Sequence, residues 1–200
     1  MPNCLPMSQR VRGFTLIELM VTVTLLSILA ALAAPSMGAW ISNSKVRAVS
    51  DSLQNGLRMA QAEALRRSRQ TVFTLTNDSS PQTSLTAVTN GRNWSINTVA
   101  IFGEATDVAA FVEAGVLSGV GSNVQIAGPV SICFSSIGRL VVNAIPGVNG
   151  ADCTAALIPA SYDITLTGAD RRLRVTVAVG GQVRMCDPNK TLSSSHPDGC

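Results

Sequence analysis

The apolar residues follow two different patterns along the chain. Between Phe14 and Ala34, 21 residues include a single charge, that of Glu18. A helix of about 20 apolar residues is long enough to cross the ~30 Å hydrocarbon layer of a membrane. Beyond it, apolar residues recur every three or four positions to about Arg69, and from Gln70 the period becomes two. The pattern predicts one long helix followed by β-strands.

The second half of this helix is predicted to be amphipathic. Pro35 and Gly38 interrupt the helical pattern, and a proline inside a helix usually kinks it. The residues beyond them keep the helical period, so we expect the helix to continue to about Arg69 with one apolar face. That face consists of Val46, Val49, Leu53, Leu57, Ala60 and Ala64.

The remainder of the chain reads as short strands rich in Val, Ile, Thr and Phe, separated by Gly, Pro, Asn and Ser. A Gly-Gly turn within Val179–Gln182 joins the last two strands. We therefore expect the α+β class, a long N-terminal helix packed on an antiparallel β-sheet or a small β-sandwich. The predicted strands are Thr71–Thr76, Ser95–Phe102, Val130–Phe134, Arg139–Val142, Tyr162–Thr167, Leu173–Val179 and Gln182–Cys186.

Composition and charge add a topology to this picture. Hydrophobic residues make up 46% of the 200 residues and charged residues 14%, which is apolar for a protein of this size. The net charge of +3 is too small to indicate a nucleic-acid partner by itself. Arg10 and Arg12 precede the apolar run with no acid beside them. By the positive-inside rule the N-terminus stays in the cytoplasm and the chain after Ala34 lies outside it.

The cysteines agree with that topology. Cys4 precedes the apolar run, whereas Cys133, Cys153, Cys186 and Cys200 lie in the part expected to face an oxidising compartment. Four cysteines allow three pairings. We favour Cys133 with Cys153 and Cys186 with Cys200, because each pair closes a short local loop. No Cys-x-x-Cys occurs, so we expect neither a metal nor a redox site.

Glu18 needs a physical reason within the apolar run. A secretory signal peptide fits the basic start and the small residues Ala31-Leu32-Ala33, but its apolar region gains nothing from a carboxylate. A plain membrane anchor leaves the glutamate unexplained too, at a cost of about 2.5 to 3.5 kcal/mol for a charge at the centre of a membrane helix.

The residues Gly13-Phe14-Thr15-Leu16-Ile17-Glu18 resemble the processing site of type IV prepilins and type II secretion pseudopilins. The resemblance implies that prepilin peptidase cuts after Gly13 and that Phe14 becomes the N-methylated first residue. It also implies that Glu18 neutralises the terminal amine of a neighbouring subunit during assembly. The expected parts are a leader peptide (1–13), a transmembrane and filament-core helix (14–35) and an extracytoplasmic domain (36–200).

A second resemblance rests on four segments of the C-terminal part, which are Ile132–Leu140, Tyr162–Leu166, Val175–Val177 and Gly180–Pro188. Together they resemble the C-terminal domain of GspH/FimT-type minor pilins and pseudopilins. The resemblance implies a protein of the bacterial inner membrane, with its C-terminal domain in the periplasm, that enters a type IV pilus or a type II secretion pseudopilus. There it would prime or cap assembly with other pilins or pseudopilins, without enzymatic activity, cofactor or metal.

One branch of these proteins is implicated in DNA uptake through a final Gly-Arg-x-Arg segment. Here Arg184 matches that segment but Gln182 does not. Arg171, Arg172 and Arg174 lie nearby, so a filament-borne DNA receptor is an alternative. The simpler interpretation places these arginines on the solvent face of an edge strand, where charge discourages edge pairing.

Other candidate chemistry is sparse. His196 is the only histidine and lies in a serine-rich tail, where a histidine is usually solvated. No Gly-x-Ser-x-Gly, phosphate-binding loop or His-Glu-x-x-His sequence occurs. A third alternative, a secreted and enzymatic domain with a cleaved signal peptide, therefore has no catalytic motif to support it.

Overall fold

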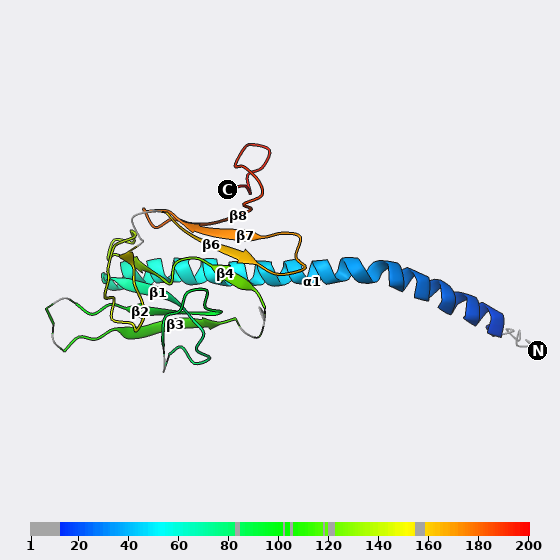
Figure 1. Ribbon diagram of the computed structural model, residues 1–200, viewed down its shortest axis with the longest axis horizontal. Helices are drawn as coiled ribbons and strands as arrows, with labels where there is room; N and C mark the ends of the chain where they lie inside the picture. The colour runs from blue at the N-terminus through cyan, green and yellow to red at the C-terminus, as the bar shows by residue number, and fades with distance from the viewer. Residues whose placement is uncertain are drawn as a thin grey trace, which may run out of the picture. The chain divides into compact units, whose positions relative to one another are not determined.

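A computed structural model describes residues 13–82, 85–101, 103–104, 106–117, 119, 123–154 and 159–200, without the side chains of residues 33–36 (Figure 1). The chain divides into two compact units, residues 1–38 and residues 39–200. One helix, α1 (Leu16–Arg67), runs through both. The strands are β1 (Thr71–Thr76), β2 (Asn93–Thr98), β3 (Ala110–Val116), β4 (Gln125–Ala127), β5 (Ser131–Phe134), β6 (Ala160–Thr165), β7 (Leu173–Val177) and β8 (Val183–Cys186).

The strands form two antiparallel sheets of four strands each. The strand order is β3-β2-β1-β5 in the first sheet and β4-β6-β7-β8 in the second. Within residues 39–200, α1 lies between the two sheets (Figure 1). The α+β class expected from the sequence, a long helix packed on antiparallel sheets, is confirmed.

The apolar face of α1 forms the shared core of residues 39–200. All six residues of the predicted stripe are at most 1% exposed. They belong to one cluster with Phe73 and Ile96 of the first sheet and with Tyr162 and Val175 of the second. Each sheet therefore buries its inner face against the same helix, and the period of three and four residues identified that contact correctly.

The helix approaches the first sheet closely where both elements have glycine. A Cβ added to Gly56 of α1 would lie 2.9 Å from the Trp94 ring and 3.1 Å from Phe73. Gly115 of β3 also leaves space for the Trp94 ring, since a Cβ added there would lie 2.3 Å from it. The indole is buried, stacks on Phe73 with ring centroids 5.7 Å apart, and donates from Nε1 to Ser52 Oγ at 3.2 Å. The two glycines thus allow a tryptophan to fit between helix and sheet.

The predicted Gly-Gly turn joins β7 and β8, and it also contacts the segment that follows β5. Gly181 has φ +92°, and a Cβ there would lie 1.9 Å from the carbonyl oxygen of Gly138. The same oxygen accepts a hydrogen bond from Gln61 Nε2 of α1 at 2.9 Å. Next to it, Leu140 N–H donates to the carbonyl of Val179 at 3.0 Å. The helix, the second sheet and the segment that follows β5 of the first sheet therefore meet at this turn.

The predicted strands differ from the structure in several places. Residues 139–142 form no strand: Gly138 (φ +75°) turns the chain, and Leu140 makes only an isolated bridge with Phe134. The segment leaves the sheet because its N–H groups bond in two directions, Leu140 to the β7–β8 turn and Val141 to Cys133. Strands β3 and β4 were missed. The predicted Ser95–Phe102 is β2, shifted to Asn93–Thr98, and Phe102 lies outside the described residues.

Candidate assembly segment and arginine cluster

The start of α1 is fixed by Thr15, one residue before Leu16. Its Oγ1 accepts a hydrogen bond from the backbone N–H of Glu18 at 3.3 Å, and its carbonyl accepts from Leu19 N–H at 3.1 Å. A threonine that satisfies a free amide of the first turn is an N-cap, and Thr-x-x-Glu is the sequence of a capping box. The sequence interpretation missed this role of Thr15. Glu18 thus lies where a negative charge also favours the positive end of the helix dipole.

The side chain of Glu18 has no partner of its own among the described residues. The bond to Thr15 uses its backbone amide, and within the described part of the chain no hydrogen bond or ion pair reaches its carboxylate. Gly13 and Phe14 precede the helix, and the Phe14 side chain is 78% exposed. The predicted cleavage and methylation residues, Gly13 and Phe14, thus lie just before the helix whose first turn contains the predicted assembly residue, Glu18, with its carboxylate free of partners among the described residues.

The surface of α1 from Leu16 to Leu32 is apolar and uncovered. Every residue in this range is exposed, including the large aliphatic side chains. Its hydroxyls are satisfied within the helix: Thr22, Thr24 and Ser27 donate at 2.8 to 2.9 Å to carbonyls three or four residues earlier. Such internal bonding leaves no unpaired hydroxyl donor to face an apolar medium.

By length and composition, no single helical segment among the described residues qualifies as a membrane span. The segments Leu16–Leu32 and Met37–Arg67 qualify only when they are taken as one broken span. The leader expected at 1–13 lies outside the described residues except for Gly13, as do Cys4, Arg10 and Arg12.

Each of the two disulfides ties a loop or the tail to one strand, and the two pairs are those favoured from the sequence. Cys133 bonds Cys153 and Cys186 bonds Cys200, across 20 and 14 residues. The first belongs to a second apolar cluster, with Val72 among its members, away from the helix-facing core. It holds the loop after β5 over the outer face of the first sheet. The second ties the C-terminal tail to the end of β8.

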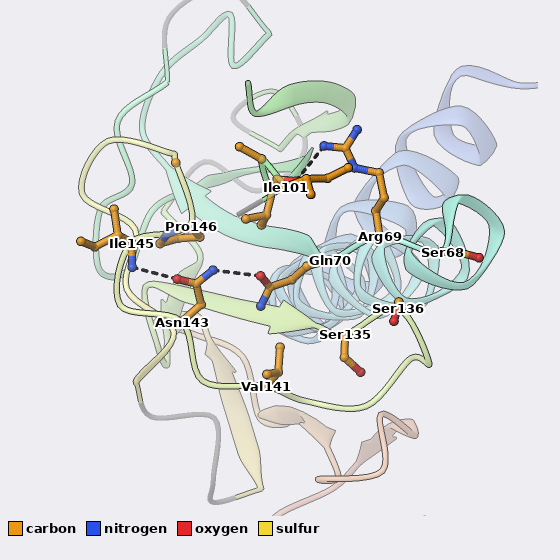
Figure 2. Close-up of a pocket in the computed structure, with 13 residues that line it drawn as sticks. Ser68, Arg69, Gln70, Ile101, Ser135, Ser136, Val141, Asn143, Ile145 and Pro146 are labelled. Carbon is orange, nitrogen blue, oxygen red and sulfur yellow. Dashed lines mark hydrogen bonds between the residues drawn. The ribbon is translucent and has the colours of Figure 1, made fainter. Parts of the chain in front are cut away.

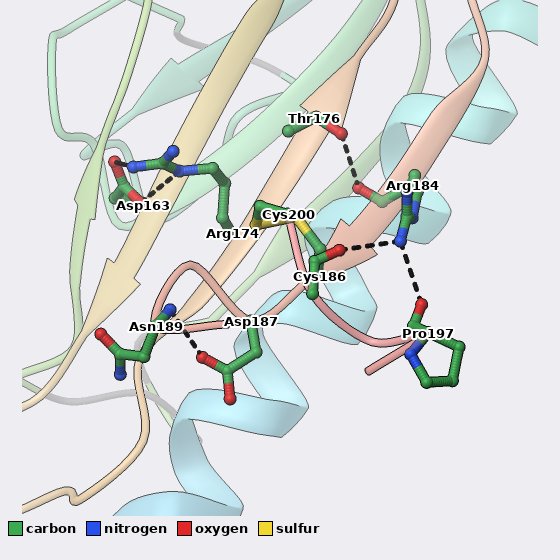
Figure 3. The surroundings of a disulfide bond; sticks show 10 residues. Asp163, Arg174, Thr176, Arg184, Cys186, Asp187, Asn189, Pro197 and Cys200 are labelled. Carbon is green, nitrogen blue, oxygen red and sulfur yellow. Dashed lines mark hydrogen bonds and ion pairs between the residues drawn. A yellow bond between two sulfur atoms is a disulfide. The ribbon is translucent and has the colours of Figure 1, made fainter. Parts of the chain in front are cut away.

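The arginines predicted to form a basic cluster are each bonded within the chain. Arg174 on β7 stands directly opposite Asp163 on β6. Its Nε and Nη2 reach the two carboxylate oxygens at 2.7 and 2.9 Å (Figure 3). This hydrogen-bonded pair raises the pKa of the Arg174 guanidinium further. The two-pronged geometry is the strongest form of such an ion pair.

Arg184 and Arg172 bond to neutral groups. Arg184 Nη2 donates to the carbonyls of Pro197 at 3.0 Å and Gly199 at 2.8 Å, so it holds the tail that the disulfide closes (Figure 3). Arg172 Nε donates to Asn189 Oδ1 at 3.0 Å. The one arginine that matches the DNA-uptake segment thus has a structural task in the tail.

Arg171 lies against two acids that the fold brings together. Its Nη2 is 3.1 Å from Asp187 and 3.6 Å from Asp198, which also accepts from Lys190 Nζ at 2.6 Å. Burial acts to raise the pKa of the Asp187 carboxyl, but the Asn189 backbone N–H and Arg171 hold it below its usual range. Lys190 likewise lowers the pKa of Asp198. Both carboxylates stay charged at neutral pH, so their negative charges offset the positive charge of the arginine cluster.

A pocket of about 700 Å³ lies where α1 ends (Figure 2). Ser68, in the left-handed region at φ 49°, turns the chain there. Asn143 Nδ2 donates to Gln70 Oε1 at 2.9 Å, and its own Oδ1 accepts from Ile145 N–H at 3.0 Å. The lining residues include no histidine, cysteine or carboxylate. The pocket thus offers no acid–base pair, and the described residues contain no cluster suited to a metal ion.

Two comparisons relate the chain to known proteins. A family model, the prokaryotic N-terminal methylation motif, matches residues 8–34. No curated protein matches in sequence. Among solved structures, the type IV minor pilin FimU of Pseudomonas aeruginosa is similar at 14% identity, with a TM-score of 0.49 over 74% of this chain and 95% of that one. The minor pseudopilin EpsH from the Type 2 Secretion System of Vibrio cholerae has 12% identity and a TM-score of 0.42, covering 73% and 99%.

The matched range contains the cap and the candidate assembly residues. Gly13, Phe14, Thr15 and Glu18 all lie within it, as does the exposed apolar part of α1 to Leu32. The N-terminal resemblance noted from the sequence is therefore confirmed: residues 8–34 match the family model of the prokaryotic N-terminal methylation motif.

Proposed function

We propose that the chain is a minor pilin or pseudopilin of the GspH/FimT type, which is incorporated into a type IV pilus or a type II secretion pseudopilus and primes or caps its assembly. Prepilin peptidase cuts after Gly13 and the new N-terminus, Phe14, is methylated. The observation that carries the proposal is the methylation motif on a helix whose apolar surface is uncovered from Leu16 to Leu32. Such a surface is stable only against lipid or against other apolar helices.

The proposed mechanism uses the same segment in two surroundings. Residues 14–35 first anchor the protein in the inner membrane, with the C-terminal domain in the periplasm, and later pack among the helices of other pilins or pseudopilins. The disulfides support this location, since they persist in oxidising compartments. During transfer, Glu18 pairs with the Phe14 amine of a neighbouring subunit. A carboxylate without a partner of its own is costly in an apolar bundle, and an opposite charge offsets that cost.

The first test is the mass of the mature protein. The proposal expects a first residue of N-methyl-Phe14. A mature chain that begins near Ala34 would instead indicate a cleaved signal peptide and a secreted domain. A full-length chain that begins at the first methionine would remove the processing step from the proposal.

The second test separates assembly from helix capping. Glu18→Gln removes the charge but keeps the backbone amide that bonds Thr15 Oγ1, so the cap is preserved. Thr15→Ala removes the cap, at about 1 kcal/mol of helix stability, but keeps the charge. We expect Glu18→Gln to insert in the membrane normally and to be lost from sheared filaments, and Thr15→Ala to be retained in them. Retention of Glu18→Gln in filaments at the wild-type level would rule out the assigned role of the Glu18 charge.

The DNA-receptor alternative has no specific observation in its favour. Arg171 and Arg174 contact acids, and Arg172 and Arg184 bond neutral groups of the same chain. These bonds occupy part of each guanidinium's donors and hold the four side chains against their own chain. We therefore do not propose DNA as a partner, and we expect no salt-sensitive gel shift that depends on Arg184.

A further inference from the structure

The two sheets of residues 39–200 have four edge strands, β3, β5, β4 and β8. An edge strand carries a row of unpaired N–H and C=O groups that can bind another strand, and proteins usually blunt or cover such edges. The four edges differ in how far they are covered.

Two of the edges are closed by the chain itself. At β5, the carbonyl of Cys133 accepts from Val141 N–H at 3.0 Å. At β8, the carbonyl of Val183 accepts from Arg58 Nη2 of α1 at 3.3 Å. Directly after β8, Asp187 forms a parallel bridge with Gly199 of the tail. A third edge, β4, is only three residues long, too short to hold a guest strand firmly.

The remaining edge, β3, is seven residues long and lies at the outside of its sheet (Figure 1). Among the described residues, no backbone group other than those of β2 pairs with it. The backbone N–H of Ala114 donates to the Glu113 carboxylate at 3.2 Å. Ala114 therefore directs its amide away from β2, and since the direction alternates along a strand, Val116 directs its amide outward as well. The Glu113 side chain holds the place that a guest carbonyl would take.

The side chains of β3 suit an apolar guest that carries a positive charge. Phe111 and Val116 are 41% and 48% exposed. Glu113 is the one ionisable residue of the strand, and no cation pairs with it among the described residues. A second copy of β3, paired antiparallel about Ala114, would place two Glu113 carboxylates in diagonal cross-strand positions, where like charges repel.

We propose that the outer edge of β3 binds an extended segment of a different protein subunit, which adds a fifth strand to the first sheet. The segment is apolar and β-branched, with a lysine or arginine that faces Glu113. Main-chain hydrogen bonds supply most of the affinity in such strand addition, and the side chains select the partner. The proposal concerns residues 110–116 alone, so it stands or fails apart from the processing at Gly13 and the role of Glu18.

The test uses the purified full-length protein in detergent micelles and two synthetic peptides. Both peptides are seven residues of alternating Thr and Val with blocked ends, and their central residue is Lys in one and Glu in the other. Amide hydrogen exchange is followed by NMR at millimolar peptide. The Lys peptide is expected to slow exchange at Ala114 and Val116 by about tenfold, and the Glu peptide much less. No slowing at these two amides, or equal slowing by both peptides, would overturn the proposal.

Variants test the geometry and the charge separately. Ala114→Pro removes an outward amide that makes no bond to β2, so the native ladder is spared and the guest is blocked. Ala114→Thr keeps the amide and is its control. Glu113→Lys is expected to reverse the preference, so that the Glu peptide protects Val116 and the Lys peptide does not. Unchanged preference in Glu113→Lys, or full protection of Val116 in Ala114→Pro, would contradict strand addition at this edge.

Discussion

The turn between β7 and β8 makes a sharp prediction, because two adjacent glycines there have opposite surroundings. Gly181 has φ +92°, and a Cβ would lie 1.9 Å from the carbonyl oxygen of Gly138 and 2.4 Å from Gln61 Nε2. Gly180 has nothing within 4 Å of its Cβ position and no positive φ. Gly181→Ala should therefore be strongly destabilising, and Gly180→Ala is its matched control.

The magnitude follows from two terms. A side chain in the left-handed region costs about 1 to 2 kcal/mol. Displacing the Gly138 carbonyl breaks its bond from Gln61 Nε2, worth about 0.5 to 1.5 kcal/mol. We expect Gly181→Ala to lose about 3 kcal/mol of unfolding free energy, which lowers Tm by roughly 6 to 12 °C in a chain of this length. Gly180→Ala should stay within about 0.5 kcal/mol of the wild type.

Thermal unfolding of the full-length protein in detergent, followed by circular dichroism, measures these changes. A double-mutant cycle with Gln61→Ala adds a second check. Gln61→Ala should cost less in the Gly181→Ala background than in the wild type, because its hydrogen bond is already lost there. If Gly181→Ala were no more destabilising than Gly180→Ala, the close approach between this turn and the Gly138 carbonyl would be refuted.

Two further predictions concern single side chains in the same domain. The Tyr162 hydroxyl is fully buried and has no hydrogen-bond partner among the described residues, and burial raises its pKa. Tyr162→Phe should therefore raise the unfolding free energy by about 1 kcal/mol. A loss of stability in denaturant titration would instead reveal a bonded hydroxyl. Hydrogen bonds from Arg66 and Arg67 lower the pKa of Glu63 to about 2. The ionised Glu63 therefore contributes fully to the free energy of unfolding above its ordinary pKa of 4.5, and this contribution is lost as the pH falls through about 2. Glu63→Gln should cost about 1 kcal/mol at neutral pH, and this cost should shrink towards zero as the pH falls through about 2; a pH-independent difference would contradict the ion pair.

The helix was predictable from sequence because its signal is local. Val46, Leu53 and Leu57 share a face through helical spacing alone, whatever packs against them. The strand β3 was missed because it lacks such a local signal: Ala110, Ala114 and Gly115 are poor strand formers, and its side chains are largely exposed. Its strand character comes from pairing with β2, a non-local contact.

The arginine cluster shows the same limit for a candidate site. Between Arg171 and Lys190 the sequence contains five basic residues and one acid. The fold adds Asp163 from the neighbouring strand and Asp198 from the tail that the disulfide closes. Which acid faces which base depends on strand register and chain closure, and neither can be derived from spacing along the chain.

Neither disulfide involves α1, which has a mechanical consequence. Both covalent loops lie beyond residue 132, so neither disulfide joins the helix to a sheet. Among the described residues, packing and hydrogen bonds such as that from Thr71 Oγ1 to the Ala60 carbonyl at 2.8 Å hold the helix against the sheets. A force that pulls along the helix axis acts parallel to the buried stripe from Val46 to Ala64. It therefore shears all the contacts between the helix and the sheets at the same time. Chemical reduction would loosen the loops and the tail, yet it would leave the packed contact between helix and sheets intact.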